Sequence, residues 1–481
     1  MKILSLVIVF LGYMLVSTAN WVLHKFGNVT YEQVMFHLNV PLDAETKLIH
    51  SYLQNTVMMA SIITIALYII MLKTSPRKCL MFSILFLIVS LTISWNRLEV
   101  GKIIAEYQNQ KIMGNFYEQH YVDPHQVKIT APNTKRNLIM IFAESMESTY
   151  ANEKYFGHNL IPELSQIAVE NTHFSHNAQL GGFQNIKGAK YTQASMVSQL
   201  CAIPLRLPVK AARYRPVNGF LPGALCLSDI LAKDGYIQSF MIGMTRLFSG
   251  TDKYLETHGN PKILDWDFYS ERDHLPKNTD HKRKRVVRDI NLFKYAKEEI
   301  SLLSAEEKPF AFTIMTLDTH FGNEHFENKV CRAIYHDDNI ADEENFKNVV
   351  SCSSMQIANF VEWIKQQPFY NQTEIVIVGD HLTMSHTIFN DKMDRTVYDV
   401  YMNPAIKDKT FTQNRLFTAL DTLPTLLEGL GYKIAGHKLG LGVSLFSGEK
   451  TLLEQGITVD KLNEELDKQS AVYNKLLYGE N

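Results

Sequence analysis

Acidic and imidazole side chains stand shortly after three apolar runs of strand length. The side chains are Glu144, His320, Asp380 and His381, and the runs before them span residues 137–143, 309–317 and 374–378. Carboxylates and imidazoles together bind hard or borderline divalent cations. Because a single acid after a strand is more often a residue of a helix first turn, the prediction of a metal site rests on their joint occurrence.

The elements that would position these side chains alternate along the chain. Apolar runs without alternation are typical of strands buried on both faces of a parallel sheet. Stretches with helical spacing of apolar residues lie at 161–169, 225–232, 290–303 and 355–366. Together they predict an α/β domain with a mostly parallel central sheet flanked by helices. Ligands of such sheets bind beyond the carboxyl ends of the strands.

Several blocks of the sequence resemble one enzyme family. The blocks are residues 137–147 (NLIMIFAESME), 192–205 (TQASMVSQLCAIPL), 317–320 (LDTH), 350–353 (VSCS), 379–381 (GDH) and 439–442 (LGLG). Over roughly residues 137–447 the chain is similar to the bacterial phosphoglycerol transferase I family, which acts on osmoregulated periplasmic glucans. That family belongs to the alkaline phosphatase/sulfatase superfamily, and lipoteichoic acid synthase is a more distant relative. The resemblance implies a sulfatase-like catalytic domain.

The resemblance also implies roles for individual residues. Glu144, Thr192, Asp380 and His381 would hold one divalent cation, and Thr192 would also be the nucleophile. Three further residues would contact the substrate: His320 the phosphate, and Arg246 and Ser385 the phosphoglycerol head group. We expect Mn²⁺ as the cation, although Mg²⁺ and Zn²⁺ also accept such ligands.

These residues suit phosphoryl transfer. A threonine hydroxyl is a poor nucleophile until a coordinated cation lowers its pKa. Thr192 also precedes a helical pattern at 193–200, and a helix N-terminus favours bound phosphate. We therefore expect metal-dependent transfer of phosphoglycerol from phosphatidylglycerol to a periplasmic or cell-surface glycan through a phospho-Thr192 intermediate.

Two alternatives stay open. One is phosphoethanolamine transfer to lipid A or another glycolipid, although that branch usually carries Gly-Glu-Thr where this chain has Ala143-Glu144-Ser145. The other is a non-catalytic envelope scaffold or sensor. A sulfatase is less favoured, because no Cys/Ser-x-Pro-x-Arg block surrounds Thr192; residues 201–206 imitate that block with the wrong spacing.

The sequence departs from the family on the acceptor side. Relatives have a Trp-Gly pair before an acidic residue, whereas this chain has Arg-Val-Val-Arg-Asp at 285–289. The basic run at 281–285 is either a solvated loop or a contact for anionic lipid head groups. The formal net charge of -2 gives no reason to expect nucleic-acid binding.

The first hundred residues predict a membrane anchor. Uncharged apolar runs at 3–18, 57–72 and 80–95 are close to the length of transmembrane helices. The cluster Lys73, Arg77 and Lys78 marks a cytoplasmic loop, which places everything after the third run outside the cytoplasm. In the alternative, the first run is a cleaved signal peptide. We expect a multi-pass protein of the bacterial inner membrane with its catalytic domain in the periplasm or outside.

This topology predicts three parts. Residues 1–95 would be the anchor with three transmembrane helices, 96–136 an interfacial connector, and 137–481 the extracytoplasmic catalytic domain. A short surface helix is expected at 31–40 within the anchor.

Cysteine usage fits an oxidising compartment. Cys201, Cys226, Cys331 and Cys352 lie in the proposed exported domain, and an even number there indicates two disulfides. Of the three possible pairings we expect the sequence-local one, Cys201–Cys226 and Cys331–Cys352; four buried free thiols are the alternative.

Overall fold

A computed structural model of the chain describes residues 1–26, 46–206, 219–273, 286–321, 324–335, 342–384, 388–389 and 393–479. Three segments with sequence predictions lie outside these residues: the stretch 31–40, the basic run 281–285 and Ser385. The described residues divide into two compact units, one of residues up to Ile112 and one of almost all described residues from Met113 onward.

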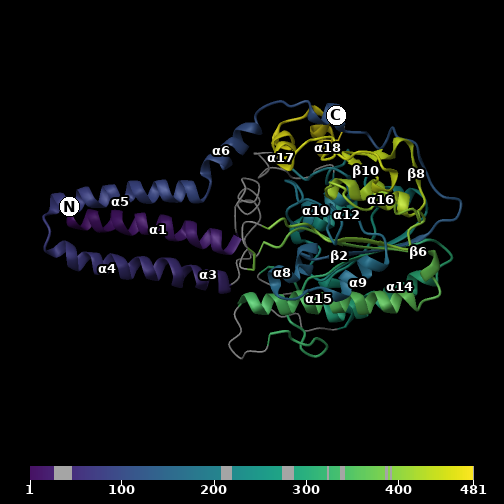
Figure 1. Ribbon diagram of the computed structural model, residues 1–481, viewed down its shortest axis with the longest axis horizontal. Coiled ribbons are helices and arrows are strands. Elements are labelled where there is room, and N and C mark those ends of the chain that lie inside the picture. The colour runs from purple at the N-terminus through teal and green to yellow at the C-terminus, as the bar shows by residue number, and fades with distance from the viewer. Residues whose placement is uncertain are drawn as a thin grey trace. The chain divides into compact units, whose positions relative to one another are not determined.

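The first unit is helical. Its elements are α1 (Lys2–Phe26), α3 (Thr46–Tyr52), η1 (Leu53–Met58), α4 (Met59–Leu72), α5 (Pro76–Arg97) and α6 (Val100–Asn109). Within the unit α1 packs along α5 and α4 (Figure 1). Three helical segments, Lys2–His24, Ile49–Leu72 and Pro76–Arg97, are long and apolar enough to cross a membrane. They contain the three predicted runs and extend each of them to 22–24 residues.

A six-stranded sheet forms the centre of the second unit. Its order is β4 (Lys262–Leu264), β3 (Ile237–Ile242), β5 (Phe310–Met315), β2 (Asn137–Ala143), β6 (Thr373–Gly379), β7 (Asp399–Met402). All neighbours are parallel except β7, which runs antiparallel to β6. The sheet is therefore mostly parallel, as predicted. Every residue of β6 and all but the first of β2 are buried, because helices cover both faces.

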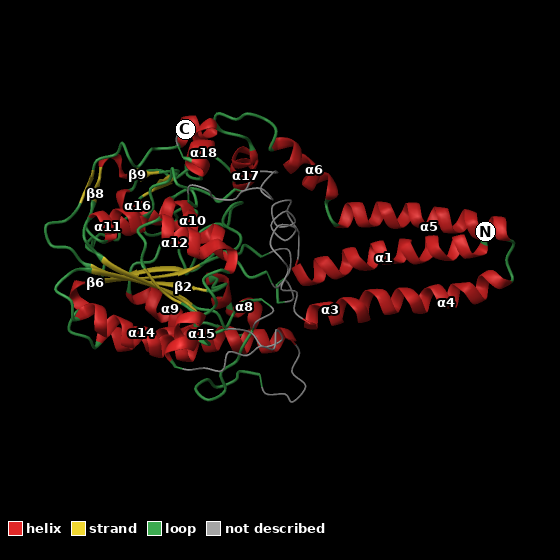
Figure 2. Ribbon diagram, turned by 180° about the vertical axis from the view of Figure 1, so that it is seen from behind, coloured by secondary structure: helices red, strands yellow, loops and turns green. Residues whose placement is uncertain are grey.

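Helices lie on both sides of this sheet (Figure 2). On one side are α9 (Pro162–Glu170), α14 (Asp289–Ser304) and α15 (Asp342–Lys365), and on the other are α10 (Thr192–Cys201), α11 (Leu227–Lys233), α12 (Thr251–Thr257) and α16 (Thr422–Gly429). The remaining helices and strands are α7 (Phe116–His120), β1 (Ile129–Thr130), α8 (Glu153–Phe156), α13 (Trp266–Arg272), β8 (Lys433–Ile434), β9 (Lys438–Leu439), β10 (Gly442–Val443), α17 (Val459–Asp467) and α18 (Ala471–Tyr478). Short 3-10 turns are η2 (Ser148–Ala151), η4 (Phe248–Gly250), η5 (Tyr370–Gln372), η6 (Ala419–Asp421), η7 (Ala435–His437) and η8 (Leu445–Ser447).

The three predicted strands correspond to β2, β5 and β6, and the four predicted helical stretches overlap α9, α11, α14 and α15. Strands β3, β4 and β7 were not predicted. The run Ile237–Ile242 is interrupted by Gln238 and Ser239, and Ser239 Oγ donates to Glu299 Oε1 of α14 at 2.7 Å. Polar residues in a buried strand thus find partners that are remote in sequence, which no local pattern reveals.

The second unit begins before the predicted catalytic domain. Strand β1 pairs with β8, and Val122 N donates to Gly440 O at 2.8 Å. The later half of the expected connector therefore packs with the C-terminal region. The division into anchor, interfacial connector and catalytic domain stays a prediction.

Two disulfides connect neighbouring elements of the second unit. Cys201 at the end of α10 bonds to Cys226, which precedes α11, and Cys331 bonds to Cys352 in α15. This is the sequence-local pairing. Cys79 of α5 is a buried free thiol.

A substitution at Gly182 would test how the segment before α10 packs. A Cβ at this position would lie 1.8 Å from the backbone oxygen of Val397, whose N–H and C=O both hydrogen-bond to Phe183. Because a backbone carbonyl cannot move aside easily, we expect Gly182→Ala to lower the free energy of unfolding by about 1–3 kcal/mol, measured by denaturant titration. The control Val169→Ala, at a position 72% exposed, should change it by less than about 0.5 kcal/mol. Equal stability of the two variants would contradict this packing.

Candidate metal centre

Glu144, Asp380 and His381 meet at the carboxyl ends of two neighbouring strands. Ala143 of β2 is in register with Gly379 of β6, so the residues that follow them emerge side by side. One ligand atom from each of the three lies within 4.8 Å of the others, and all three side chains are buried. The structure thus brings together three of the four metal ligands that the sequence predicted.

Thr192, the fourth predicted ligand, lies beside this cluster. It is the first residue of α10, and its Oγ1 is 3.4 Å from His381 Nε2. The same nitrogen is 3.3 Å from Asp380 Oδ2 and 3.9 Å from Glu144 Oε1. His381 Nδ1 is 2.8 Å from the carbonyl oxygen of Leu382. Because a carbonyl oxygen only accepts hydrogen bonds, Nδ1 donates to it, and Nε2 is the ring nitrogen that faces the cluster.

The electrostatics of the cluster suit a divalent cation. Asp380 Oδ1 accepts the backbone N–H groups of Ser145 and His381 at 2.7 and 2.8 Å. Its Oδ2 is buried and has no hydrogen-bond partner among the described residues. Burial and the nearby Asp380 carboxylate raise the pKa of Glu144 to about 8. Two crowded buried carboxylates, one with an unused oxygen, fit a cation that would neutralise them.

The loop after β5 anchors the backbone of Glu144. Thr316 Oγ1 accepts the N–H of Glu144 at 2.9 Å, and Thr319 Oγ1 donates to its carbonyl oxygen. Ser145 Oγ donates to Glu144 Oε1 at 2.7 Å. Hydrogen bonds thus hold both the backbone and the side chain of this candidate ligand in place.

Two further side chains of α10 fix that helix against the end of β6. Ser195 Oγ donates to the carbonyl oxygen of Asp380, and Gln199 Nε2 donates to that of Gly379 at 3.0 Å. Thr192, Ser195 and Gln199 are spaced i, i+3, i+7 and so share one face of the helix. Sequence reasoning missed this role. The sequence carried no clear signal for it, because Gln193 and Ser198 of the same helix are also polar and the face that binds β6 does not stand out.

A buried ion pair holds the chain on the other side of His381. Arg395 donates to both carboxylate oxygens of Glu147, and Glu147 Oε1 accepts the N–H of Thr383 at 3.0 Å. Glu147 is fully buried. Sequence reasoning missed this pair as well, because its members are distant in sequence.

His320 and Arg246 follow β5 and β3, which are adjacent in the sheet, but neither belongs to the ligand cluster. The ring of His320 packs edge-on against Phe248 at 6.4 Å between centroids. Arg246 donates through Nε and Nη2 to Asp265 at 3.0 and 2.9 Å, and its side chain is 37% exposed. Burial raises the pKa of Asp265, but these hydrogen bonds outweigh it and leave the pKa below its ordinary value.

The region that departs from the family supports the loop that carries His320. Asp289 accepts the backbone N–H groups of Leu317 and Asp318 at 2.7 and 3.2 Å. Arg288 Nη1 donates to Asp318 Oδ1 at 3.2 Å. Burial and the Asp318 carboxylate raise the pKa of Asp289 well above its usual range.

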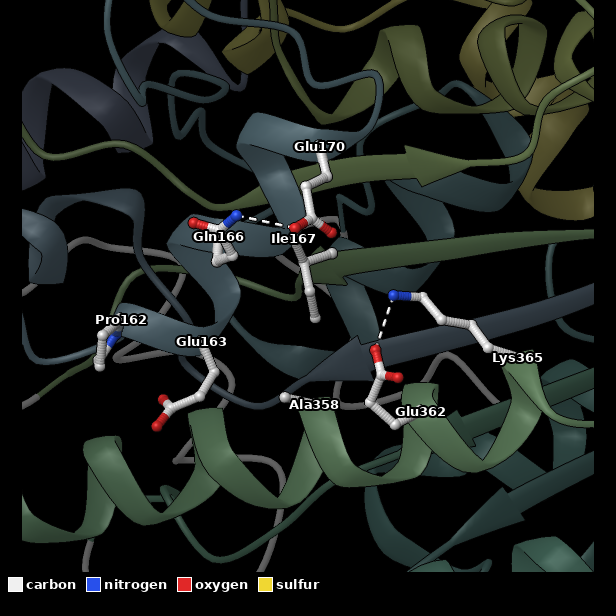
Figure 3. A pocket seen from close by; sticks show the side chains of 8 residues that line it. All are labelled: Pro162, Glu163, Gln166, Ile167, Glu170, Ala358, Glu362 and Lys365. Atoms are coloured by element: carbon white, nitrogen blue, oxygen red, sulfur yellow. Dashed lines mark hydrogen bonds and ion pairs between the residues drawn. The ribbon is translucent and has the colours of Figure 1, made fainter.

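Two other features lie apart from this cluster. Cys226, Asp229 and His258 are close together, but the sulfur of Cys226 is in a disulfide and His258 is 2.8 Å from Asp229 Oδ2, so the group forms a structural contact. A pocket between α9 and α15 is lined by residues of those two helices, none of them from the metal cluster (Figure 3).

Comparisons with known proteins agree with the fold and the motifs. The family model described as Sulfatase matches residues 136–432. Phosphoglycerol transferase I of Escherichia fergusonii is 32% identical over 349 residues, covering 69% of this chain and 41% of that protein. The same enzyme of Salmonella arizonae is 31% identical over 333 residues, with the same coverage of 69% and 41%. The chain thus spans less than half the length of these relatives.

A solved structure gives the same picture of the fold. The lipoteichoic acid synthase LtaP of Listeria monocytogenes aligns with a TM-score of 0.51 at 17% identity, covering 69% of this chain and 80% of that one. The superfamily typically binds a divalent metal, and the cluster at Glu144 is a candidate site for it. Because the Sulfatase model covers more than half of its length, the chain belongs to the sulfatase family.

Proposed function

We propose that this chain is a membrane-anchored phosphotransferase. It would move phosphoglycerol from a membrane phospholipid, phosphatidylglycerol, to a hydroxyl of a periplasmic or cell-surface glycan or glycolipid. The observation that carries the proposal is the hydroxyl of Thr192, which lies 3.4 Å from His381 Nε2 beside the buried carboxylates of Glu144 and Asp380. Relatives named phosphoglycerol transferase I support the choice of the transferred group.

Glu144, Asp380, His381 and Thr192 would hold the divalent cation, for which Mn²⁺ is our first candidate. A bound cation supplies a lower pKa for the Thr192 hydroxyl and neutralises charge on the phosphoryl oxygens. The three buried ligands and the α10 contacts keep the hydroxyl in one position, which reduces the entropy that must be lost in the reaction.

The reaction would be a double displacement. In the first step Thr192 Oγ1 attacks phosphorus, the bond from phosphorus to the diacylglycerol oxygen breaks, and diacylglycerol leaves with a proton. In the second step the acceptor hydroxyl attacks phosphorus, the bond to Thr192 Oγ1 breaks, and Thr192 recovers a proton. The proton lost by the acceptor hydroxyl offsets the proton that Thr192 recovers, so no net proton is released and charge and atoms balance over the cycle.

Neighbouring groups would bind the phosphodiester. Thr192 begins a helix of ten residues, and a helix N-terminus attracts anions. His320 would contact the phosphate, and Arg246 and Ser385 the glycerol head group. Arg246 supports this role because Asp265 fixes its orientation while part of its side chain stays exposed.

The membrane location follows from the substrate. The leaving diacylglycerol stays in the bilayer, and three helices of the chain are long and apolar enough to anchor it there. We propose an inner-membrane location with the second unit in the periplasm or outside, as the basic loop after α4 indicates.

The covalent intermediate gives the direct test. Purified protein incubated with Mn²⁺ and a mixture of phosphatidylglycerol and phosphatidylethanolamine should gain a phosphoglycerol adduct on Thr192 and release diacylglycerol, measured by mass spectrometry. Thr192→Ala should show neither product, with a loss of turnover of about 10³-fold or more. A phosphoethanolamine adduct would instead select the alternative donor. Full turnover by Thr192→Ala would remove the proposal.

Metal binding should depend on pH. The raised pKa of Glu144, about 8, means that the metal-free protein binds a proton there at neutral pH, and the cation must displace it. The apparent affinity for Mn²⁺ should therefore rise with pH, by about tenfold per unit below pH 8, measured by calorimetry. The rise in melting temperature on adding Mn²⁺ should be larger at higher pH. Glu144→Gln is the control and should bind weakly at every pH; a wild-type affinity that does not change with pH would contradict this picture.

Ser195 and Ser198 form a matched pair on α10. Both are fully buried and both donate to a backbone carbonyl, but Ser195 reaches Asp380 whereas Ser198 reaches Gly188 at 2.8 Å. We expect similar losses of stability in Ser195→Ala and Ser198→Ala, about 1–3 kcal/mol. Only Ser195→Ala should lower kcat, by about tenfold or more, because it loosens the nucleophile relative to the metal ligands. Equal kcat values in the two variants would show that this contact only supports folding.

A further inference from the structure

The loop after β3 presents two large apolar side chains to solvent. Leu247 is 68% exposed and Phe248 is 36% exposed. The two residues that follow, Ser249 and Gly250, have φ values of 54° and 75°. Left-handed backbone is costly for a serine, so the turn needs support from its surroundings. We call residues 246–250 the tip.

Contacts on both sides hold the tip in place. Arg246 at its start makes the paired hydrogen bonds to the buried Asp265. At its end, Thr251 Oγ1 lies 2.8 Å from Phe248 O and 3.0 Å from Gln193 Oε1. Gln193 follows Thr192 directly in α10. The tip is therefore fixed to the start of the helix that carries the nucleophile, and the Phe248 ring packs on His320.

The chemistry of the tip matches one kind of partner. Arg246, whose side chain is 37% exposed while its guanidinium pairs with Asp265, directly precedes two exposed apolar residues. These residues follow β3, at the same carboxyl edge of the sheet as the candidate metal ligands. A phospholipid likewise has an anionic phosphate, which suits Arg246, and apolar chains, which suit Leu247 and Phe248. The Leu247 side chain cannot form hydrogen bonds, and sugar hydroxyls need polar partners when they are buried. The tip therefore suits a lipid better than a glycan. The three apolar helices are long enough to cross a membrane, and that membrane would supply such a lipid.

We propose that Leu247 and Phe248 contact the acyl chains of the phospholipid donor while its phosphate lies at Thr192. This inference rests on the proposed function and adds a residue-level account of how the enzyme distinguishes a lipid from a soluble phosphodiester.

Donor chain length provides the experiment. The full chain in detergent micelles is assayed with dioleoyl and with dihexanoyl phosphatidylglycerol. The kcat/KM for the dioleoyl donor is divided by the kcat/KM for the dihexanoyl donor, and this ratio is compared between each variant and the wild type. Removing the apolar contact with Leu247→Ser should lower this ratio about tenfold, since burying part of a leucine favours the long-chain donor by about that factor. Phe248→Ala should lower it in the same direction. The controls Val169→Ser and Leu302→Ser, at positions 72% and 65% exposed on outer helices, should keep the wild-type ratio.

A binding measurement separates this inference from the reaction itself. In the Thr192→Ala background, the affinity for dioleoyl phosphatidylglycerol should fall about tenfold when Leu247→Ser is added. An unchanged affinity would overturn the inference even if transfer occurs. An equal loss with both donors, or an effect confined to the KM of the acceptor, would also overturn it. If transfer is never seen but the binding difference appears, the proposed reaction fails while the lipid contact stands.

Discussion

The arrangement of the second unit depends on the close approach of two carboxylates and one imidazole at the joined ends of β2 and β6. Glu144 and Asp380 are buried within reach of each other, a placement that is unfavourable for two negative charges. Burial and, to a smaller extent, the Asp380 carboxylate raise the pKa of Glu144, which favours a proton on this carboxyl when no cation is bound. The two carboxylates therefore favour the binding of a positive charge at this site. The surrounding hydrogen bonds prevent the two carboxylates from moving apart to reduce their repulsion.

Three sets of contacts prevent that movement, and each comes from a different part of the chain. The loop after β5 binds the backbone of Glu144, α10 binds the carbonyl oxygens at the end of β6, and the Glu147–Arg395 pair holds the chain beyond His381. One of these supports, α10, also carries the proposed nucleophile Thr192. Because Thr192 and Ser195 are on the same face of α10, the contact that fixes the helix also sets the distance from the Thr192 hydroxyl to the candidate metal ligands. In the proposed reaction, the same contact would therefore position both the nucleophile and the cation.

Sequence patterns predicted the parts of this arrangement that are local. The strands β2, β5 and β6 are uninterrupted apolar runs, so the acids and the imidazoles after them could be recognised as neighbours at one sheet edge. Thr192 needed the family resemblance, because a threonine before a helical pattern is an ordinary cap. Ser195 and Arg395 could not be predicted, since their partners are chosen by how α10 and the β7 region pack on β6. Polar residues that form hydrogen bonds with partners distant in the sequence cannot be recognised from the local sequence pattern.

The two halves of the proposed reaction differ in how firmly the structure supports them. On the donor side, Arg246, Phe248 and His320 form a connected set that is tied to α10 through Thr251. On the acceptor side, the Trp-Gly pair of relatives is replaced, and Arg288 and Asp289 are instead engaged with the loop that carries His320. In the proposed reaction, chemistry at phosphorus uses the first set, whereas the acceptor can differ without altering the candidate metal ligands. The sequence at 285–289 therefore bears on the choice of acceptor and leaves the proposed donor site and nucleophile unchanged.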